Sequence, residues 1–279
     1  MNKTIISSHK APNSRSMGPG VRQVIPSAVE HIDPFVFLDH FGPMERRPGA
    51  QGVPPHPHAG IATITYLFSG SNRHQDSLGN DVLVHSGDMA WMQAGKGIVH
   101  AEGMNENRSE PETVHGLQFW ISLPAKDKFI DHAFYHHPSA TLPTVQVQES
   151  RVKVLCGSLL GHSSPVSSLS PAYMYEIHIP QGQQLSLPIE EGNTAGLYLV
   201  EGAVVSEGRS LLPTSMTAYS TEGNSLTLHA QEASHLLLFG GQPLNEPIVG
   251  YASFVMNSEA QIRQVMQDYQ QGRMGTIQD

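Results

Sequence analysis

The feature that most constrains the fold of this chain is a regular succession of short apolar segments, each followed by a turn. In the first half these segments lie at 61–68, 81–85, 89–93, 98–102 and 115–123. Similar segments recur in the second half at 173–179, 196–200, 215–219, 225–230 and 235–239. Short strands at regular spacing with glycine turns are typical of β-sandwiches and β-barrels. The 26 glycines and 20 prolines also favour turns over long helices. We therefore expect an all-β fold.

The two halves of the chain resemble each other at one specific point. The segment YLFSG at 66–70 has a counterpart, YLVEG, at 198–202, so that a strand runs into a glycine turn in both halves. This repeat predicts two related β-domains with a boundary between residues 125 and 150. We place the domains at 1–135 and 136–279.

One helix is predicted near the end of the sequence. Ser258 followed by Gln261 fits a capping box, and Gly272 is placed to end the helix. An apolar stripe at helical spacing follows the cap, formed by Ile262, Val265, Met266 and Tyr269. Packing against the β-core explains such a stripe better than binding of a partner protein.

Charge and cysteine content exclude several classes of function. A net charge of −9 and the absence of any Lys/Arg run argue against nucleic-acid binding. No stretch approaches the roughly 18 apolar residues of a membrane helix, and the N-terminus lacks the apolar core of a secretory signal. Cys156 is the single cysteine and is expected to be a small buried residue. A chain with one cysteine fits a reducing compartment, so we expect a cytoplasmic protein.

Two short pairs of potential metal ligands carry the functional argument. They are His56-Pro57-His58 and His100-Ala101-Glu102, each with i, i+2 spacing. On a β-strand such residues point to the same face, so two neighbouring strands could aim three imidazoles and one carboxylate at one point. This donor set suits a divalent first-row transition metal with open coordination positions.

Each pair also has a simpler interpretation when taken alone. The chain contains sixteen histidines, so close pairs also arise by chance, and His56-Pro57-His58 also fits a surface turn. Proline is compatible with a strand only at its start or at a sheet edge. The combination of both pairs, separated by β-segments with turn glycines, is much more specific than either pair.

These residues lie in segments that resemble the cupin motifs and, more narrowly, the pirin family. The stretch 52–70 resembles the first cupin motif and 87–100 resembles the second. The segments similar to pirins span nearly the whole chain, at 32–35, 38–42, 55–58, 74–80, 87–102, 117–124 and 246–257. The resemblance implies a bicupin, with two β-barrel or jelly-roll domains and a C-terminal helix. It also implies an iron site in the N-terminal domain whose ligands fall on His56, His58, His100 and Glu102.

The chain departs from the family pattern at one position, and its C-terminal half carries no ligand pair. Germin-type cupins often carry a ligand glutamate four residues after the second histidine of HxH, and here that position is Ala62. Glu102 is then the only carboxylate that the motifs supply. The C-terminal half has no HxH pair, and His229 and His235 stand isolated in the sequence. We therefore expect a C-terminal domain without a metal site.

The resemblance implies a quercetin 2,3-dioxygenase that takes a flavonol and O2, opens the heterocycle and releases carbon monoxide. Fe(II) is the expected metal, although nickel, cobalt, manganese and copper also accept N/O ligands. The metal would stabilise the deprotonated flavonol as a Lewis acid. Glu102 is the candidate general base for the 3-hydroxyl proton. Candidate pocket residues are Phe68, Trp91, Gln93, Gln118 and Trp120, and ordinary core packing is the alternative for each of them.

Two other functions remain open at this point. Some pirins are described as redox-responsive iron proteins that bind a transcription-factor complex, although this sequence shows no basic patch or obvious docking helix. A metal-dependent enzyme acting on another phenol or dicarbonyl compound is the second alternative. Two fused cupins could bury their own interface, so we expect a monomer.

Overall fold

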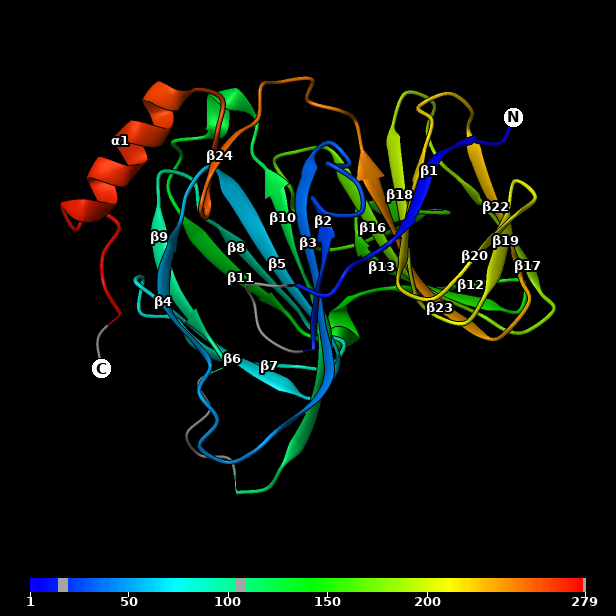
Figure 1. The fold of residues 1–279 in the computed structure, drawn as a ribbon, viewed down its shortest axis with the longest axis horizontal. Coiled ribbons are helices and arrows are strands. Elements are labelled where there is room, and N and C mark those ends of the chain that lie inside the picture. Colours follow the sequence, from blue (N-terminus) through cyan, green and yellow to red (C-terminus); the bar gives the residue numbers. More distant parts are fainter. Residues whose placement is uncertain (15–19, 104–108, 278–279) are drawn as a thin grey trace. The chain divides into compact units, whose positions relative to one another are not determined.

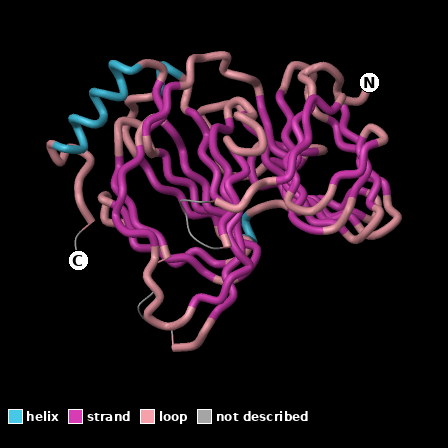
Figure 2. Tube along the Cα trace, in the orientation of Figure 1, coloured by secondary structure: helices cyan, strands magenta, loops and turns pink. Residues whose placement is uncertain are grey.

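The computed structural model describes residues 1–14, 20–103 and 109–277, and the described chain is mostly β-strand (Figure 2). It divides into two compact units. One unit, here the N-terminal barrel, contains Asp39–Ser139 and the residues from Asn245 onward. The other, here the C-terminal barrel, contains Arg22–Leu38, Ala140–Leu244 and the first residues of the chain. The expected all-β bicupin architecture is confirmed. Each compact unit consists of several chain segments. The predicted division into continuous domains at 1–135 and 136–279 therefore stays a prediction.

The N-terminal barrel is built around two facing sheets (Figure 1). The larger sheet has the strand order β11-β8-β5-β10-β3-β2. Its strands are β2 (Val21–Ile25), β3 (Phe35–Arg46), β5 (Ile61–Ser69), β8 (Met89–Gln93), β10 (Glu112–Ser122) and β11 (Ala133–His137). In the division into compact units, β2 beyond Val21 and β3 up to Leu38 are counted with the other unit. The smaller sheet has the order β4-β9-β6-β7. Its strands are β4 (Val53–His58), β6 (Ser71–Asp76), β7 (Asp81–His85) and β9 (Ile98–Glu102).

The C-terminal barrel repeats this plan with a seven-stranded and a four-stranded sheet. The larger sheet has the order β1-β21-β18-β23-β16-β13-β12. Its strands are β1 (Ile5–Lys10), β12 (Thr144–Val147), β13 (Ser150–Cys156), β16 (Ala172–Ile179), β18 (Thr194–Glu201), β21 (Ser215–Tyr219) and β23 (Ser234–Gly241). The smaller sheet, in the order β17-β22-β19-β20, contains β17 (Gln184–Pro188), β19 (Val204–Ser206), β20 (Arg209–Leu211) and β22 (Ser225–Ala230).

The repeated segments seen in the sequence are β5 and β18, and both end in a glycine that the fold requires. Gly70 and Gly202 have φ values of 81° and 87°. A Cβ at Gly70 would lie 2.7 Å from the carbonyl oxygen of Thr113, and one at Gly202 would lie 2.4 Å from that of Ala233. Glycine is therefore needed at both turns for its conformation and for its lack of a side chain.

The helix α1 (Glu259–Gln270) packs on the N-terminal barrel beside the hairpin β24 (Val249–Tyr251) and β25 (Phe254–Met256) (Figure 1). Its N-cap is Ser258, as expected, with the side chain accepting from the Gln261 amide. Ile262 and Val265 are buried against Phe254 and Met256, which confirms core packing for the stripe, while Tyr269 is 42% exposed. Among the described residues, no helix has the length and apolar character of a membrane span.

The described chain also contains a short hairpin and two 3-10 turns. The C-terminal barrel carries a small hairpin of β14 (Ser158–Leu159) and β15 (His162–Ser163). Single 3-10 turns lie at Ala125–Asp127 and Ser139–Thr141. Cys156 is buried, as its lone occurrence suggested, and burial raises the pKa of its thiol to about 12.

In each barrel, a buried lysine forms hydrogen bonds to chain segments that are distant in sequence. In the N-terminal barrel, the Lys128 ammonium donates to the carbonyl oxygens of Gly60 and Val255, at 2.8 and 3.0 Å, and to the Ser122 hydroxyl. Burial lowers the pKa of Lys128 to about 8. In the C-terminal barrel, Lys3 donates to three backbone carbonyls, those of Asn193, Ser220 and Thr221. Such charge-assisted bonds compensate the cost of burying an ammonium group.

Candidate metal centre

The two predicted ligand pairs lie on adjacent strands of the smaller sheet of the N-terminal barrel. β4 pairs antiparallel with β9, and His56 lies directly opposite His100. His58 follows His56 by two residues and therefore points to the same face. A register shift between Val53 and His56 accommodates Pro54 and Pro55, and Pro57 is tolerated because β4 is an edge strand bonded to β9 on one side only.

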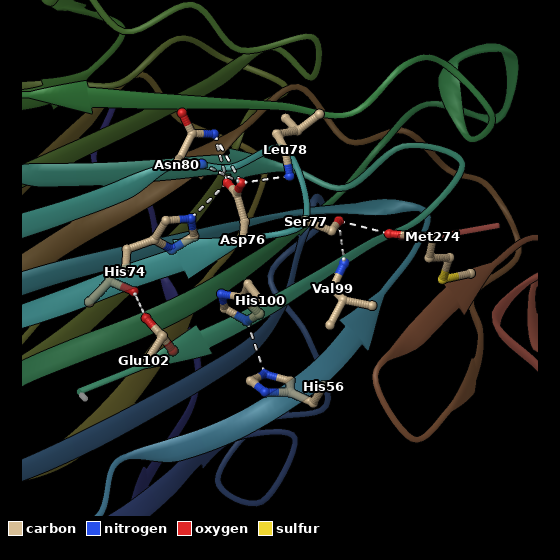
Figure 3. A network of polar contacts seen from close by, with 11 residues as sticks. His56, His74, Asp76, Ser77, Leu78, Asn80, Val99, His100, Glu102 and Met274 are labelled. Atoms are coloured by element: carbon tan, nitrogen blue, oxygen red, sulfur yellow. Dashed lines mark hydrogen bonds and ion pairs between the residues drawn. The ribbon is translucent and has the colours of Figure 1, made fainter. Parts of the chain in front are cut away.

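The structure brings the three histidines together. One nitrogen atom of each of His56, His58 and His100 lies within 4.8 Å of the others. The Nε2 atoms of His56 and His100 are 2.9 Å apart (Figure 3). The ring centroids of His58 lie 4.9 Å from those of both other histidines. Three imidazoles therefore converge on one point inside the barrel.

Burial keeps the imidazoles of His58 and His100 neutral. His58 and His100 are each 1% exposed. Burial, with a smaller contribution from the neighbouring His56, lowers the pKa of His58 to about 3. Burial also lowers the pKa of His100 well below its usual range, and the facing histidines add to that effect. Neutral imidazole is the form that binds a metal.

The hydrogen bonds of the cluster fit a metal. Neither ring nitrogen of His58 makes a hydrogen bond of normal geometry to a described residue, and the same holds for Nδ1 of His100. His56 Nδ1 lies 2.8 Å from the Pro54 carbonyl, which can only accept, so this nitrogen carries the proton and Nε2 keeps its lone pair. Ligands about 2.1 Å from one ion lie about 3.0 Å apart at right angles, close to the His56–His100 separation. The residues therefore fit a divalent transition metal.

Glu102 lies on the same face of β9 as His100 but outside the compact group of three histidines. Its Oε1 accepts hydrogen bonds from the Thr65 hydroxyl at 2.8 Å and from the Asn72 amide at 3.4 Å. Its Oε2 accepts one from the Gln118 amide at 2.5 Å. The carboxylate is thus buried, oriented by three donors, and held beside the histidines. Its role as a ligand stays a prediction.

A further pair, His74 and Asp76, borders the cluster and was not assigned a role from the sequence. On β6, these residues face Glu102 and His100 respectively across the pairing with β9. His74 donates to Asp76 at 3.0 Å, and its ring centroid lies 5.5 Å from that of His100 (Figure 3). Burial alone would raise the pKa of Asp76, but hydrogen bonds from His74 and Asn80 outweigh it and lower that pKa. The i, i+2 spacing of His74 and Asp76 is the signal that could have revealed them.

The strand registers separate the five candidate pocket residues into two groups. Gln118 and Trp120 pair with Thr65 and Thr63 on the face that holds Glu102. The Trp120 ring meets His58 edge-on at a centroid distance of 5.1 Å. These two residues belong to the surroundings of the cluster.

The other three candidates lie on the opposite face of the larger sheet. Trp91 pairs with Ile64 and Gln93 pairs with Ala62. On β5, Ala62 and Ile64 alternate with Thr63 and Thr65 and therefore point to the other face. Phe68 lies on this same face of β5, two residues after Tyr66, and its ring contacts that of Tyr66. Because a shift of one residue reverses the face of a strand, Trp91, Gln93 and Phe68 lie on the face opposite Glu102, and their role in the pocket stays a prediction.

The C-terminal barrel holds a second cluster that the sequence did not reveal. His235, expected to be isolated, lies directly opposite His178 on the neighbouring strand and 3.0 Å from Glu176. These three residues form another group whose possible ligand atoms lie within 4.8 Å of one another. His229 is exposed on β22, as expected for a surface histidine.

Family profiles match both halves of the chain. The profile named Pirin matches residues 18–121, and the profile named Pirin C-terminal cupin domain matches residues 174–275. A pirin-like protein from Solanum lycopersicum is 36% identical over 251 residues, which cover 88% of this chain and 84% of that protein.

Solved structures show the same architecture. The crystal structure of a quercetin 2,3-dioxygenase from Acinetobacter baumannii matches with a TM-score of 0.93 at 29% identity, covering 100% of both chains. A bacterial pirin from Escherichia coli, solved in complex with nickel(II), matches with a TM-score of 0.66 at 21% identity. That match covers 85% of this chain and 98% of the pirin.

Proposed function

The chain belongs to the pirin family, and we propose that it is a metal-dependent dioxygenase of the quercetin 2,3-dioxygenase type. In this reaction the C2–C3 and C3–C4 bonds of a flavonol break. Both atoms of O2 enter the ester product, and C3 leaves as carbon monoxide. The similarity over its full length to a structure named quercetin 2,3-dioxygenase supports this choice of reaction.

The observation that carries the proposal is the buried cluster of His56, His58 and His100. It combines the neutral imidazoles of His58 and His100, ring nitrogens without a hydrogen bond of normal geometry to a described residue, and an adjacent buried carboxylate. Purely structural histidines are normally satisfied by hydrogen bonds when buried. Unsatisfied nitrogens that converge on one point are instead expected of metal ligands.

The three histidines would hold the metal through ring nitrogens, and Glu102 is the proposed fourth ligand. Fe(II) is the proposed metal, and nickel(II), which the Escherichia coli pirin binds, is a second metal to test. When bound, such an ion supplies a Lewis acid for a phenolate or enolate oxygen and access to dioxygen chemistry.

Glu102 is the proposed base for the flavonol 3-hydroxyl. Deprotonation transfers the proton from the substrate oxygen to a carboxylate oxygen of Glu102 and leaves an electron-rich enolate. Thr65, Asn72 and Gln118 orient the carboxylate. Glu102 would act as ligand and as base in turn, so it must loosen from the metal or reorient when it accepts the proton. Gln118 and Trp120 are the proposed contacts for the flat polyphenol, because both face the cluster.

The test is carbon monoxide release from quercetin in air by protein loaded with one equivalent of Fe(II) or Ni(II). We expect release by the wild type and loss of at least 100-fold in His58→Ala, which removes a central imidazole. His85→Ala is the matched control, because His85 is exposed on β7 of the same barrel. It should retain full activity.

Two results would overturn the proposal. One is equal release by wild type and His58→Ala, which would place the reaction elsewhere. The other is no release by wild-type protein whose metal content has been confirmed. That outcome would favour a redox-responsive regulatory protein or an enzyme for a different phenol.

A further inference from the structure

We propose that Glu176, His178 and His235 form a second metal site on the C-terminal barrel, for a divalent first-row transition metal such as Zn(II). The site is separate from the cluster of His56, His58 and His100, and the inference does not depend on the proposed dioxygenase activity. Two imidazoles and one carboxylate are a common donor set for zinc and leave at least one coordination position open.

Strand pairing places the three ligands together. Glu176 and His178 are two residues apart on β16 and therefore share a face. His235 on β23 lies directly opposite His178, and Leu237 lies opposite Glu176. The cluster thus rests on two adjacent central strands of the seven-stranded sheet, where backbone hydrogen bonding fixes the positions of the Cα atoms.

The distances between donor atoms are close to those of a metal site. The Glu176 Oε1 atom lies 3.0 Å from His235 Nε2 and 3.6 Å from His178 Nε2. Ligands about 2.1 Å from a four-coordinate ion lie about 3.4 Å apart, between these two values. The two imidazole rings are stacked, with centroids 4.3 Å apart and an angle of 10° between their planes. Small side-chain rotations would bring both nitrogens to one ion.

The cluster is on the face of the sheet opposite the apolar core. Tyr175 and Ile177, which alternate with the ligands, belong to that core. Side-chain exposure is 38% for His178, 13% for His235 and 11% for Glu176. A metal could therefore reach the carboxylate from solvent, while two of the three ligands remain largely shielded from it.

A cavity of about 370 Å³ opens at the two histidines. Its wall also contains Arg151, which pairs with His178, and Glu201, which pairs with His235 across a β-bulge. The open coordination position would face this cavity.

The experiment counts metal equivalents in protein whose first site has been removed. Metal-free His56→Ala/His58→Ala protein is titrated with Zn(II) by calorimetry and with Co(II) by visible absorption. We expect one equivalent to bind and a cobalt spectrum with nitrogen and oxygen ligands. Adding His235→Ala should abolish this binding. Adding His229→Ala, an exposed histidine of the same barrel, should leave it unchanged.

Glu176→Gln in the same background provides a second variant, since it keeps the volume and an acceptor oxygen but removes the charge. We expect at least a tenfold weaker affinity for Zn(II), with an unchanged near-ultraviolet circular dichroism spectrum. The proposal is overturned if the protein lacking the first site binds no metal. It is equally overturned if Glu176→Gln and His235→Ala bind the same equivalent with the same affinity, because the cluster would then be only a hydrogen-bonded group.

Discussion

The two barrels share a plan of a larger and a smaller sheet but differ in what fills the space between the sheets. In the C-terminal barrel that space is occupied by aliphatic and aromatic side chains such as Leu197, Leu236 and Leu238, all 0% exposed. In the N-terminal barrel it holds His58, His100 and Glu102. One barrel therefore has a packed interior suited to stability, and the other has a polar interior suited to binding.

The difference arises from the phase of strand alternation. Both barrels carry ligand-type residues at i, i+2 spacing, His56 and His58 in one and Glu176 and His178 in the other. On β4 these positions face the interior, whereas on β16 the interior positions are Tyr175 and Ile177. A shift of one residue moves a set of side chains to the other face of a strand. The same motif spacing thus gives an internal cluster in one barrel and an external one in the other.

The packed interior of the C-terminal barrel predicts the largest loss of stability. Leu238→Ala should lower the free energy of unfolding by about 2–5 kcal/mol, because it removes buried apolar surface and leaves a cavity. Urea denaturation followed by circular dichroism measures this. Leu212→Ala, at a position 62% exposed, is the control and should change stability by no more than about 0.5 kcal/mol. A loss below about 1 kcal/mol for Leu238→Ala would contradict tight packing there.

The polar interior of the N-terminal barrel predicts a loss of activity instead. Glu102→Gln should reduce the rate of carbon monoxide release about 100-fold, because the amide cannot accept the flavonol proton. Bound metal, measured by elemental analysis, should fall much less than activity. Glu45→Gln, an exposed change on the same barrel, is the control. If bound metal and activity fall by the same factor, Glu102 acts only as a metal ligand and not as the base.

The two buried lysines provide a comparison in which the barrels should behave alike. Lys128→Met and Lys3→Met should each lower the free energy of unfolding by about 1.5–3 kcal/mol, because carbonyl oxygens lose a charged donor. Lys126→Met, an exposed change, should have little effect. Thermal and urea unfolding of the three variants tests this. If only one of the two substitutions lowers the free energy of unfolding, the hydrogen bonds of the other lysine do not stabilise its barrel.

Acid should destabilise the metal-free protein through the buried histidines of the N-terminal barrel. Because the folded-state pKa of His58 is lowered to about 3, the unfolded chain takes up the proton first as pH falls. The free energy of unfolding is therefore unaffected by this group above pH 6.5, and it decreases as the pH falls from 6.5 to about 3. His58→Leu should reduce the slope of unfolding free energy against pH by about 1.4 kcal/mol per pH unit in that window. An unchanged slope would contradict the burial of a neutral His58.

Much of the fold and the core of the site could be predicted from the sequence because they depend on local patterns. Glycine turns and short β-segments gave the all-β architecture, and β7, β8 and β9 begin and end at the expected residues. The i, i+2 spacing predicted that His56 and His58 share a face, and the structure places them beside His100.

Relations between strands could not be predicted from the sequence, because no local pattern contains them. Trp91 and Gln93 were assigned to the pocket because aromatic and amide side chains suit a flavonol, but the register of β8 with β5 places them on the other face. His235 stands isolated in the sequence, and Glu176 and His178 lie far from it along the chain. Only the pairing of β16 with β23 brings them together.

The most direct test of the contrast between the barrels is a crystal structure of the Fe(II)-loaded protein with quercetin under anaerobic conditions. Anomalous scattering at the iron edge locates the metal. We predict a peak among the ring nitrogens of His56, His58 and His100, with the flavonol 3-oxygen beside it and near Glu102. A peak only at Glu176, His178 and His235, or a flavonol bound away from the internal cluster, would contradict the account.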